Sequence, residues 1–154
     1  MATKKKKPAA AKTPKKTAPR KPSGKPAKAK TTKKLNESLI LAESAVRGIL
    51  EKKGKNVVCL DLRGIENAVC EYFIICEGDS NTQVEAIAGS VTDFVRKELS
   101  TRPYRSEGWQ NALWILIDYV TVIVHVFERD TRSFYNLESL WADAEAVELV
   151  KKQA

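Results

Sequence analysis

The chain has 154 residues, 43% of them hydrophobic, and a formal net charge of +8. This length suits one globular domain, and no apolar run approaches the roughly 20 residues that a membrane-spanning helix needs. The first residues also lack the apolar core of a secretory signal, so the sequence predicts a soluble, cytoplasmic protein without a membrane contact.

Charge divides the chain at residue 34. Residues 1–34 contain 13 lysines, one arginine, five of the six prolines and no acid, and they contain no Leu, Ile, Phe, Tyr or Trp. Such a segment buries too little apolar surface to offset its ordering entropy, which predicts a disordered basic tail. Residues 35–154 contain 13 basic and 19 acidic side chains, a net charge of −6, and every aromatic and cysteine. They form the expected single domain.

The tail is rich in Lys, Ala, Pro and Thr. Its positive charge, with no acid to offset it, predicts sequence-independent contact with nucleic-acid phosphates, weakened by salt. We favour contact with RNA over the alternative of a purely solubilising extension. A transit peptide is disfavoured, because such peptides prefer arginine and an amphipathic helix.

The globular part begins with an expected helix. Asn36 or Ser38 can cap it, apolar residues recur at helical spacing, and Gly54 ends it. Residues 56–62 and 72–77 are rich in Val, Ile, Leu and aromatic residues, which indicates two strands joined by a polar connection.

A second helix follows these strands. Thr82 and Glu85 have the spacing of a capping box, and the apolar positions after them keep helical period as far as Leu99. Residues 102–105 are expected to form a short extended piece that leads into the next strands.

The last third of the chain is expected to form a hairpin and helices. Residues 113–117 and 122–127 are strand-like runs a few residues apart, Asp130 is a candidate cap for a helical turn over 133–137, and a final helix is expected over 139–151. Together the segments predict a mixed sheet of about five strands covered by helices, in the α/β or α+β class.

The hairpin separates two kinds of side chain. A two-residue turn at Tyr119 and Val120 would set Trp114 opposite His125. One face would then be an aliphatic core face: Leu113, Ile115, Ile117, Val122, Val124 and Val126. The other face would suit either a binding partner or a covering helix: Trp114, Leu116, Asp118, Thr121, Ile123 and His125.

Cys59, Cys70 and Cys76 are odd in number, and two of them lie in apolar runs, which predicts reduced, buried thiols. One histidine and three scattered cysteines lack the short spacings of a metal site, so we expect neither a metal nor a cofactor.

Two features of the sequence could suggest an enzyme. Gly78, Ser80 and Asn81 join a strand to a helix N-terminus, a place where backbone N–H groups can bind an anion, as a nucleotidyltransferase would require. That enzyme also needs two or three carboxylates on neighbouring strands for Mg²⁺, and Glu128 with Asp130 is better explained by helix capping. His125 as a general base lacks an activated nucleophile nearby in sequence, so we expect no catalytic residue.

Four blocks carry a resemblance to a known family: VVCLDLRG at 57–64, EYFIICEGDSNTQVEAIA at 71–88, DYVTVIVHVF at 118–127 and RSFYNLESLWADA at 132–144. Together they resemble the ribosomal silencing factor family, also called Iojap-like proteins. The resemblance implies a fold related to nucleotidyltransferases but without their active site, and hence a protein that is not an enzyme.

The resemblance also implies a partner and an action. Family members bind the large ribosomal subunit through its ribosomal protein fourteen, at the face where the subunits meet, and so block subunit joining and repress translation under nutrient limitation. It assigns docking to five residues: Trp114, Leu116, Asp118, Tyr119 and His125. The sequence leaves open the oligomeric state of the free protein, a homodimer included.

The chain departs from the family at the hairpin turn, where Val120 and Thr121 replace a usual glycine and aspartate. Glu71 and Asp79 also replace a usual Asp and Thr, so the roles of these two positions do not transfer.

Overall fold

The computed structural model describes residues 26–149, and the side chains from residue 33 onward except that of Leu35. These residues form a six-stranded mixed sheet in the order β3-β4-β5-β2-β1-β6, in which only β2 and β5 pair in parallel. The strands are β1 (Lys55–Asp61), β2 (Tyr72–Gly78), β3 (Arg105–Glu107), β4 (Trp114–Asp118), β5 (Val122–Glu128) and β6 (Glu145–Val147). The mixed α/β class is confirmed, with one strand more than expected.

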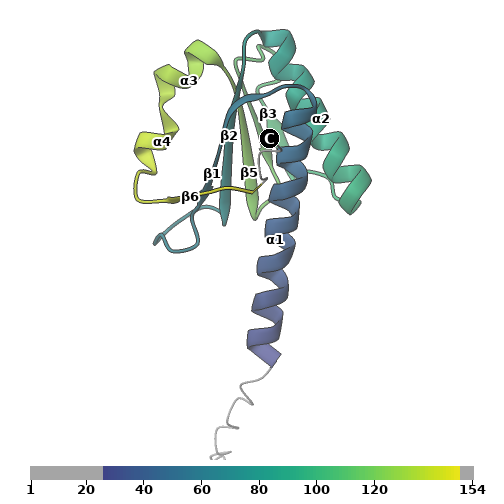
Figure 1. Cartoon of the computed structure of the whole chain (residues 1–154), viewed down its shortest axis with the longest axis vertical. Coiled ribbons are helices and arrows are strands. Elements are labelled where there is room, and N and C mark those ends of the chain that lie inside the picture. The colour runs from purple at the N-terminus through teal and green to yellow at the C-terminus, as the bar shows by residue number, and fades with distance from the viewer. Residues whose placement is uncertain (1–25, 150–154) are drawn as a thin grey trace, which may run out of the picture.

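The sheet has a different cover on each face (Figure 1). The long helices α1 (Pro26–Glu51) and α2 (Asn81–Leu99) pack on one face, whereas the short helices α3 (Arg129–Tyr135) and α4 (Leu137–Leu140) lie beyond the other. We call the first interior the helix-side core, which includes Ile74, Ile115, Ile117, Val124, Val126, Val46, Ile49, Ile87 and Val91. We call the second the aromatic core, which comprises Leu60, Leu62, Phe73, Ile75, Ile123 and Phe127.

Helix α1 starts earlier than the sequence predicted. It begins at Pro26, not at Asn36 or Ser38, so the expected boundary at residue 34 falls inside a helix. Proline is tolerated in a first helical turn, and the Ala- and Lys-rich residues after it contain no further proline or glycine. The rest of the predicted tail, residues 1–25, lies outside the described residues. At the other end Gly54 N donates to Ile49 O (3.0 Å), which confirms the predicted stop.

The helix caps lie close to the predicted ones but use other residues. Ser80, not Thr82, caps α2, because its hydroxyl accepts from Gln83 N. Glu128, not Asp130, caps α3, with its carboxylate accepting from the amides of Asp130 and Thr131. A capping group must come just before the first helical residue, and both caps lie two residues earlier than expected.

The final helix predicted over 139–151 is wrong. α4 ends at Leu140, and residues 145–147 form β6, which pairs with β1 through Cys59↔Val147 and Asp61↔Glu145. A three-residue strand has too few positions to show a local period, and its stability comes from pairing with a segment about 85 positions away. Residues 150 and 151 lie outside the described residues.

The hairpin turn lies one residue later in the chain than predicted. Leu116 pairs with His125 and Trp114 with Phe127, and Val120 and Thr121 occupy the turn. Because the shift moves every partner by two residues, each side chain keeps its predicted face. The exceptions lie at the ends. Leu113, predicted in the core face, precedes β4 and is 43% exposed. Tyr119 enters the helix-side core, and Thr121, predicted on the Trp114 face, lines a pocket beside α1.

The turn carries backbone strain at Val120. Its φ is +74°, and Thr121 N donates to Tyr119 O (2.9 Å) across it, the geometry of a tight three-residue turn. A β-branched residue rarely adopts positive φ, because its Cβ crowds the backbone. Asp118 Oδ1 offsets part of this cost by accepting from Val120 N (2.7 Å).

Val120→Gly should therefore raise the free energy of unfolding by about 1 kcal/mol, because glycine removes the strain and the Val120 side chain is already 61% exposed. Urea unfolding followed by circular dichroism measures the change. Val69→Gly is the matched control, since Val69 is 65% exposed without a positive φ and should lose stability instead. Equal destabilisation of both variants would contradict strain at the turn.

Candidate functional site

Trp114 lies at the centre of a group of aromatic rings on the α3 side of the sheet. Strand β4 presents it from next to the sheet edge, and its indole stacks on Phe127 of β5 (centroids 4.9 Å apart, 25° between planes). The ring of Tyr135, at the end of α3, also contacts the indole, with centroids 4.8 Å apart. Trp114 is half-buried, so part of the ring reaches the surface. We call Trp114, Leu116, His125, Phe127 and Tyr135 the aromatic site.

His125 fixes the orientation of the indole. Trp114 Nε1 donates a hydrogen bond to His125 Nδ1 (3.1 Å), and the imidazole lies beside Phe73, edge to face (4.8 Å). His125 is only 4% exposed, and this burial lowers its pKa to about 4. The neutral ring must then carry its proton on Nε2, which is buried without a hydrogen-bond partner among the described residues.

The predicted role of His125 as a direct partner contact is corrected by this burial. Two further predicted contacts are also buried. Asp118 is 9% exposed and ties the turn to Arg105, whose Nε donates to Asp118 Oδ2 (3.2 Å). Tyr119 is 6% exposed in the helix-side core, opposite to the face expected, and burial raises its pKa to about 12. Of the five predicted docking residues, Trp114 and Leu116 are half-buried and reach the surface.

A polar network attaches α3 to the sheet. The guanidinium of Arg132 donates to Glu77 Oε2 at the end of β2 (3.2 Å), to Glu138 Oε1 in α4 (2.6 Å) and to the carbonyl of Asn56 (2.7 Å). Asn56 lies in a bulge of β1 with φ +49°, and its amide donates in turn to Glu77 Oε1 (2.7 Å). Three separate elements thus meet at one arginine, whose side chain is only 11% exposed.

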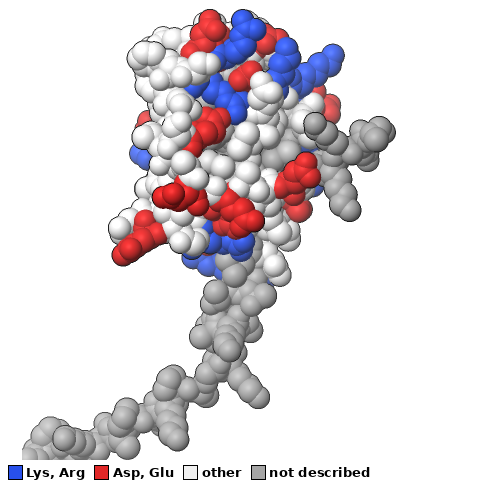
Figure 2. Space-filling view, turned by 60° about the vertical axis from the view of Figure 1, so that its left-hand side comes forward, with Lys and Arg blue, Asp and Glu red and all other residues white. Residues whose placement is uncertain are grey.

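The sequence did not indicate which apolar side chains of α3 and α4 stay exposed to solvent. Helical spacing alone places five apolar residues in one stripe that would seal the sheet: Phe134, Tyr135, Leu137, Leu140 and Trp141. Only Leu137 and Trp141 pack on the aromatic core. Phe134 is 82% exposed and Leu140 73%. Figure 2, which turns the α3, α4 and β6 side forward, shows a largely uncharged area between charged groups above and acidic groups below.

The predicted anion site is occupied by the chain's own groups. Ser80 Oγ accepts from Gln83 N, and Gln83 Oε1 accepts from Asp79 N (2.7 Å). Asn81 donates to the carbonyl of Asn111, and the Asp79 carboxylate, paired with Lys55, adds negative charge. This arrangement disfavours a phosphate at Gly78, Ser80 and Asn81. Within residues 26–149 no group of three His, Cys, Asp or Glu side chains could hold a metal ion.

The cysteines are free thiols, two of them buried and one half-buried. Burial raises the pKa of Cys59, Cys70 and Cys76 to about 12 each, so at neutral pH they are poor nucleophiles.

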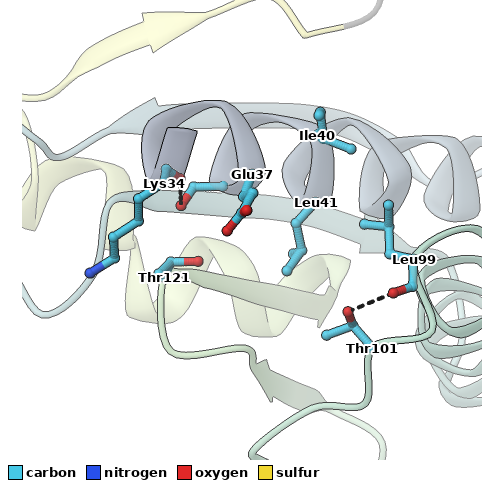
Figure 3. A pocket seen from close by; sticks show the side chains of 8 residues that line it. Lys34, Glu37, Ile40, Leu41, Leu99, Thr101 and Thr121 are labelled. Atoms are coloured by element: carbon cyan, nitrogen blue, oxygen red, sulfur yellow. Dashed lines mark hydrogen bonds between the residues drawn. The ribbon is translucent and has the colours of Figure 1, made fainter. Parts of the chain in front are cut away.

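One pocket, of about 390 Å³, lies where α1 passes the end of α2 and the β4–β5 turn (Figure 3). Leu41 and Leu99 line it, while two of its hydroxyls are already bonded to backbone carbonyls, Ser38 to Lys34 and Thr101 to Leu99. Lys34 and Glu37 of α1 also line it. No helix among the described residues is both long and apolar enough to cross a membrane.

The burial of His125 predicts a pH dependence of stability. Its folded pKa of about 4 lies below the value of 6.5 for an unperturbed histidine, so the unfolded chain binds a proton that the native protein excludes. Stability should therefore fall by about 2 kcal/mol between pH 7 and pH 5. His125→Asn, which keeps an acceptor near Nδ1 but does not titrate, should lose this part of the decrease. Urea unfolding at both pH values tests it, and identical slopes in both proteins would contradict the burial effect.

Comparison with known proteins places the chain in a family. The family model described as "Ribosomal silencing factor during starvation" matches residues 32–154. The ribosomal silencing factor of Halalkalibacterium halodurans is 44% identical over 109 residues, which cover 71% of this chain and 92% of the relative. That of Bacillus subtilis is 40% identical over 115 residues, covering 75% and 95%.

Two solved structures share the fold. A crystal structure of a Bacillus halodurans protein matches with a TM-score of 0.61 at 40% identity, covering 70% of this chain and 96% of that one. A crystal structure from Chromobacterium violaceum matches with a TM-score of 0.63 at 32% identity, covering 74% and 96%. The sequence, the mixed sheet and these matches agree, and the chain belongs to the ribosomal silencing factor family.

Proposed function

We propose that this protein represses translation by docking on the large ribosomal subunit through the aromatic site. The partner is the subunit's ribosomal protein fourteen, and the bound protein blocks joining of the small subunit by its bulk. Family membership supports a ribosomal role. The observation that carries the docking assignment is Trp114, a half-buried indole held in one orientation by His125 and Phe127. Tryptophan in a fixed orientation is a typical interface anchor, because little entropy is lost when it binds.

This action is stoichiometric and requires no chemical step. The two side chains that could suggest catalysis have structural roles: His125 is buried and neutral, and Ser80 caps a helix. Repression by exclusion depends only on affinity and on the volume of the bound domain. We propose a cytoplasmic location, because the partner in this proposal is a ribosomal subunit.

Charge supports association with a basic partner. Residues 35–154 have a net charge of −6, although the whole chain has +8. An acidic domain is drawn to a basic ribosomal protein and oriented during the encounter, an effect that salt weakens.

The basic tail adds a second attachment in this proposal. Its lysines contact phosphates of ribosomal RNA beside the docking position, without base recognition. A second weak contact on the same chain raises the effective concentration of the domain at its primary site. Residues 1–25 carry ten of the positive charges of the tail and precede α1.

Trp114→Ala should reduce cosedimentation with purified large subunits by at least about tenfold, because it removes the central anchor. The change also removes stacking on Phe127, so circular dichroism must show that the variant is folded at the assay temperature. Leu50→Ala serves as the control, since Leu50 is 46% exposed on α1, across the sheet from the aromatic site. Wild-type affinity of folded Trp114→Ala would refute docking through this residue.

Removal of residues 1–25, which leaves α1 complete, should weaken binding to large subunits and flatten the dependence of log affinity on log salt concentration. Replacement of the ten basic residues by glutamine at constant length separates charge from chain length and should have the same effect. Filter binding at several salt concentrations measures both slopes. A slope equal to that of the full chain would exclude RNA contact by this segment.

A further inference from the structure

Helix α3 exposes its large apolar side chains. Phe134 is 82% exposed and Tyr135 48%, and no residue of α3 is buried. A seven-residue helix that packs none of its side chains in a core gains little from burial and is too short to be stable by itself. Other interactions must therefore hold it in place.

Polar contacts hold α3 instead. The Glu128 carboxylate satisfies the amides of Asp130 and Thr131 at its start, and the Asn136 N–H donates to Arg132 O at its end (2.9 Å). Between them the Arg132 side chain, 11% exposed, reaches Glu77 of β2, itself 9% exposed. Separating the two charges would leave each of them largely buried without its partner, which is costly. The ion pair therefore holds α3 in this position. The helix is thus fixed to the sheet while its apolar side chains point outward.

The exposed rings continue the aromatic site. Tyr135 contacts the Trp114 ring at 4.8 Å, and Phe134 meets Tyr135 edge to face at 5.2 Å (88° between planes). Trp114, Tyr135 and Phe134 therefore form one row of contacting rings, which runs from a half-buried indole to a nearly free phenyl. We call this row the aromatic strip.

We propose that Phe134 and Tyr135 of α3 form the outer half of the docking surface, and that they bind an apolar depression on a basic protein of the large subunit. This inference rests on the proposed function and extends its surface to residues that the sequence had assigned to the core. Continuity with Trp114 is the first argument, since a partner that covers the free edge of the indole also meets Tyr135. Exposed aromatic residues on a rigid element are typical interface anchors.

The charges around the aromatic strip favour a protein as the binding partner over a nucleic acid. Glu128 precedes α3, Asp130 lies in its first turn and Glu138 lies in α4. Its two arginines have carboxylate partners, Arg132 in the buried network and Arg129 with Asp130 (3.9 Å). An RNA strand that stacked its bases on Phe134 would bring phosphates against these carboxylates, whereas a basic protein surface would complement them.

The experiment compares Phe134→Ser with the wild type for binding to purified large subunits, using the full chain. Because the phenyl is nearly free, the variant should keep the wild-type melting temperature and weaken binding about tenfold. Leu50→Ser, an exposed apolar residue on α1, is the matched control and should bind like the wild type. Trp114→Ala, measured in parallel, reports on the proposed function itself.

The outcomes are distinct. Weakened binding of Phe134→Ser with unchanged Leu50→Ser supports the extended surface. Wild-type binding of Phe134→Ser, with loss for Trp114→Ala, overturns the inference and leaves the proposed function standing. Wild-type binding of both variants overturns both. If Phe134→Ser alters only self-association, measured by analytical ultracentrifugation of the free protein, the strip is a contact between copies and the inference is likewise overturned.

Discussion

The parallel pairing of β2 with β5 is the constraint on which the rest of the structure depends. All seven residues of β2 are buried, and β5 is buried at six of seven positions. A central pair of this kind excludes water from both faces, so each face requires its own cover. Helices α1 and α2 cover one face completely, as their fully buried Ala42, Ala45, Ile87 and Val91 show.

The other face is covered less completely, and this asymmetry produces the candidate site. The segment after β1, together with α3, α4 and β6, brings Leu62, Ile65, Leu137, Trp141 and a few smaller side chains onto this face. The cover is incomplete over β4, which lies next to the edge strand β3. Tyr135 of α3 contacts Trp114, yet Trp114 stays half-buried. Trp114 therefore has one side in the core and the other at the surface. The incomplete cover leaves that outer side available for docking.

Around the aromatic site, polar groups fix the positions of their neighbours, as apolar packing does elsewhere in the molecule. His125 and Asp118 are buried beside the aromatic site and the turn, and both orient a neighbour: the indole of Trp114 and the amide of Val120. Arg132 does the same for α3. Directional bonds position side chains that must remain exposed, which burial cannot do because it would remove them from the surface.

The sequence by itself determined the mixed sheet, the two long helices and the division of the hairpin into an aliphatic and an aromatic face. These follow from local period, and the alternation of a strand survives a register shift of two residues. Only the tertiary structure decided the turn at Val120, the strand β6, the burial of His125 and the exposure of Phe134. Each depends on a contact between distant segments: β6 needs the edge of β1, and α3 faces outward because Arg132 binds Glu77, 55 positions away. Helical spacing places Phe134 and Leu137 on neighbouring positions of a helix, but the partner across space selects which of them is buried.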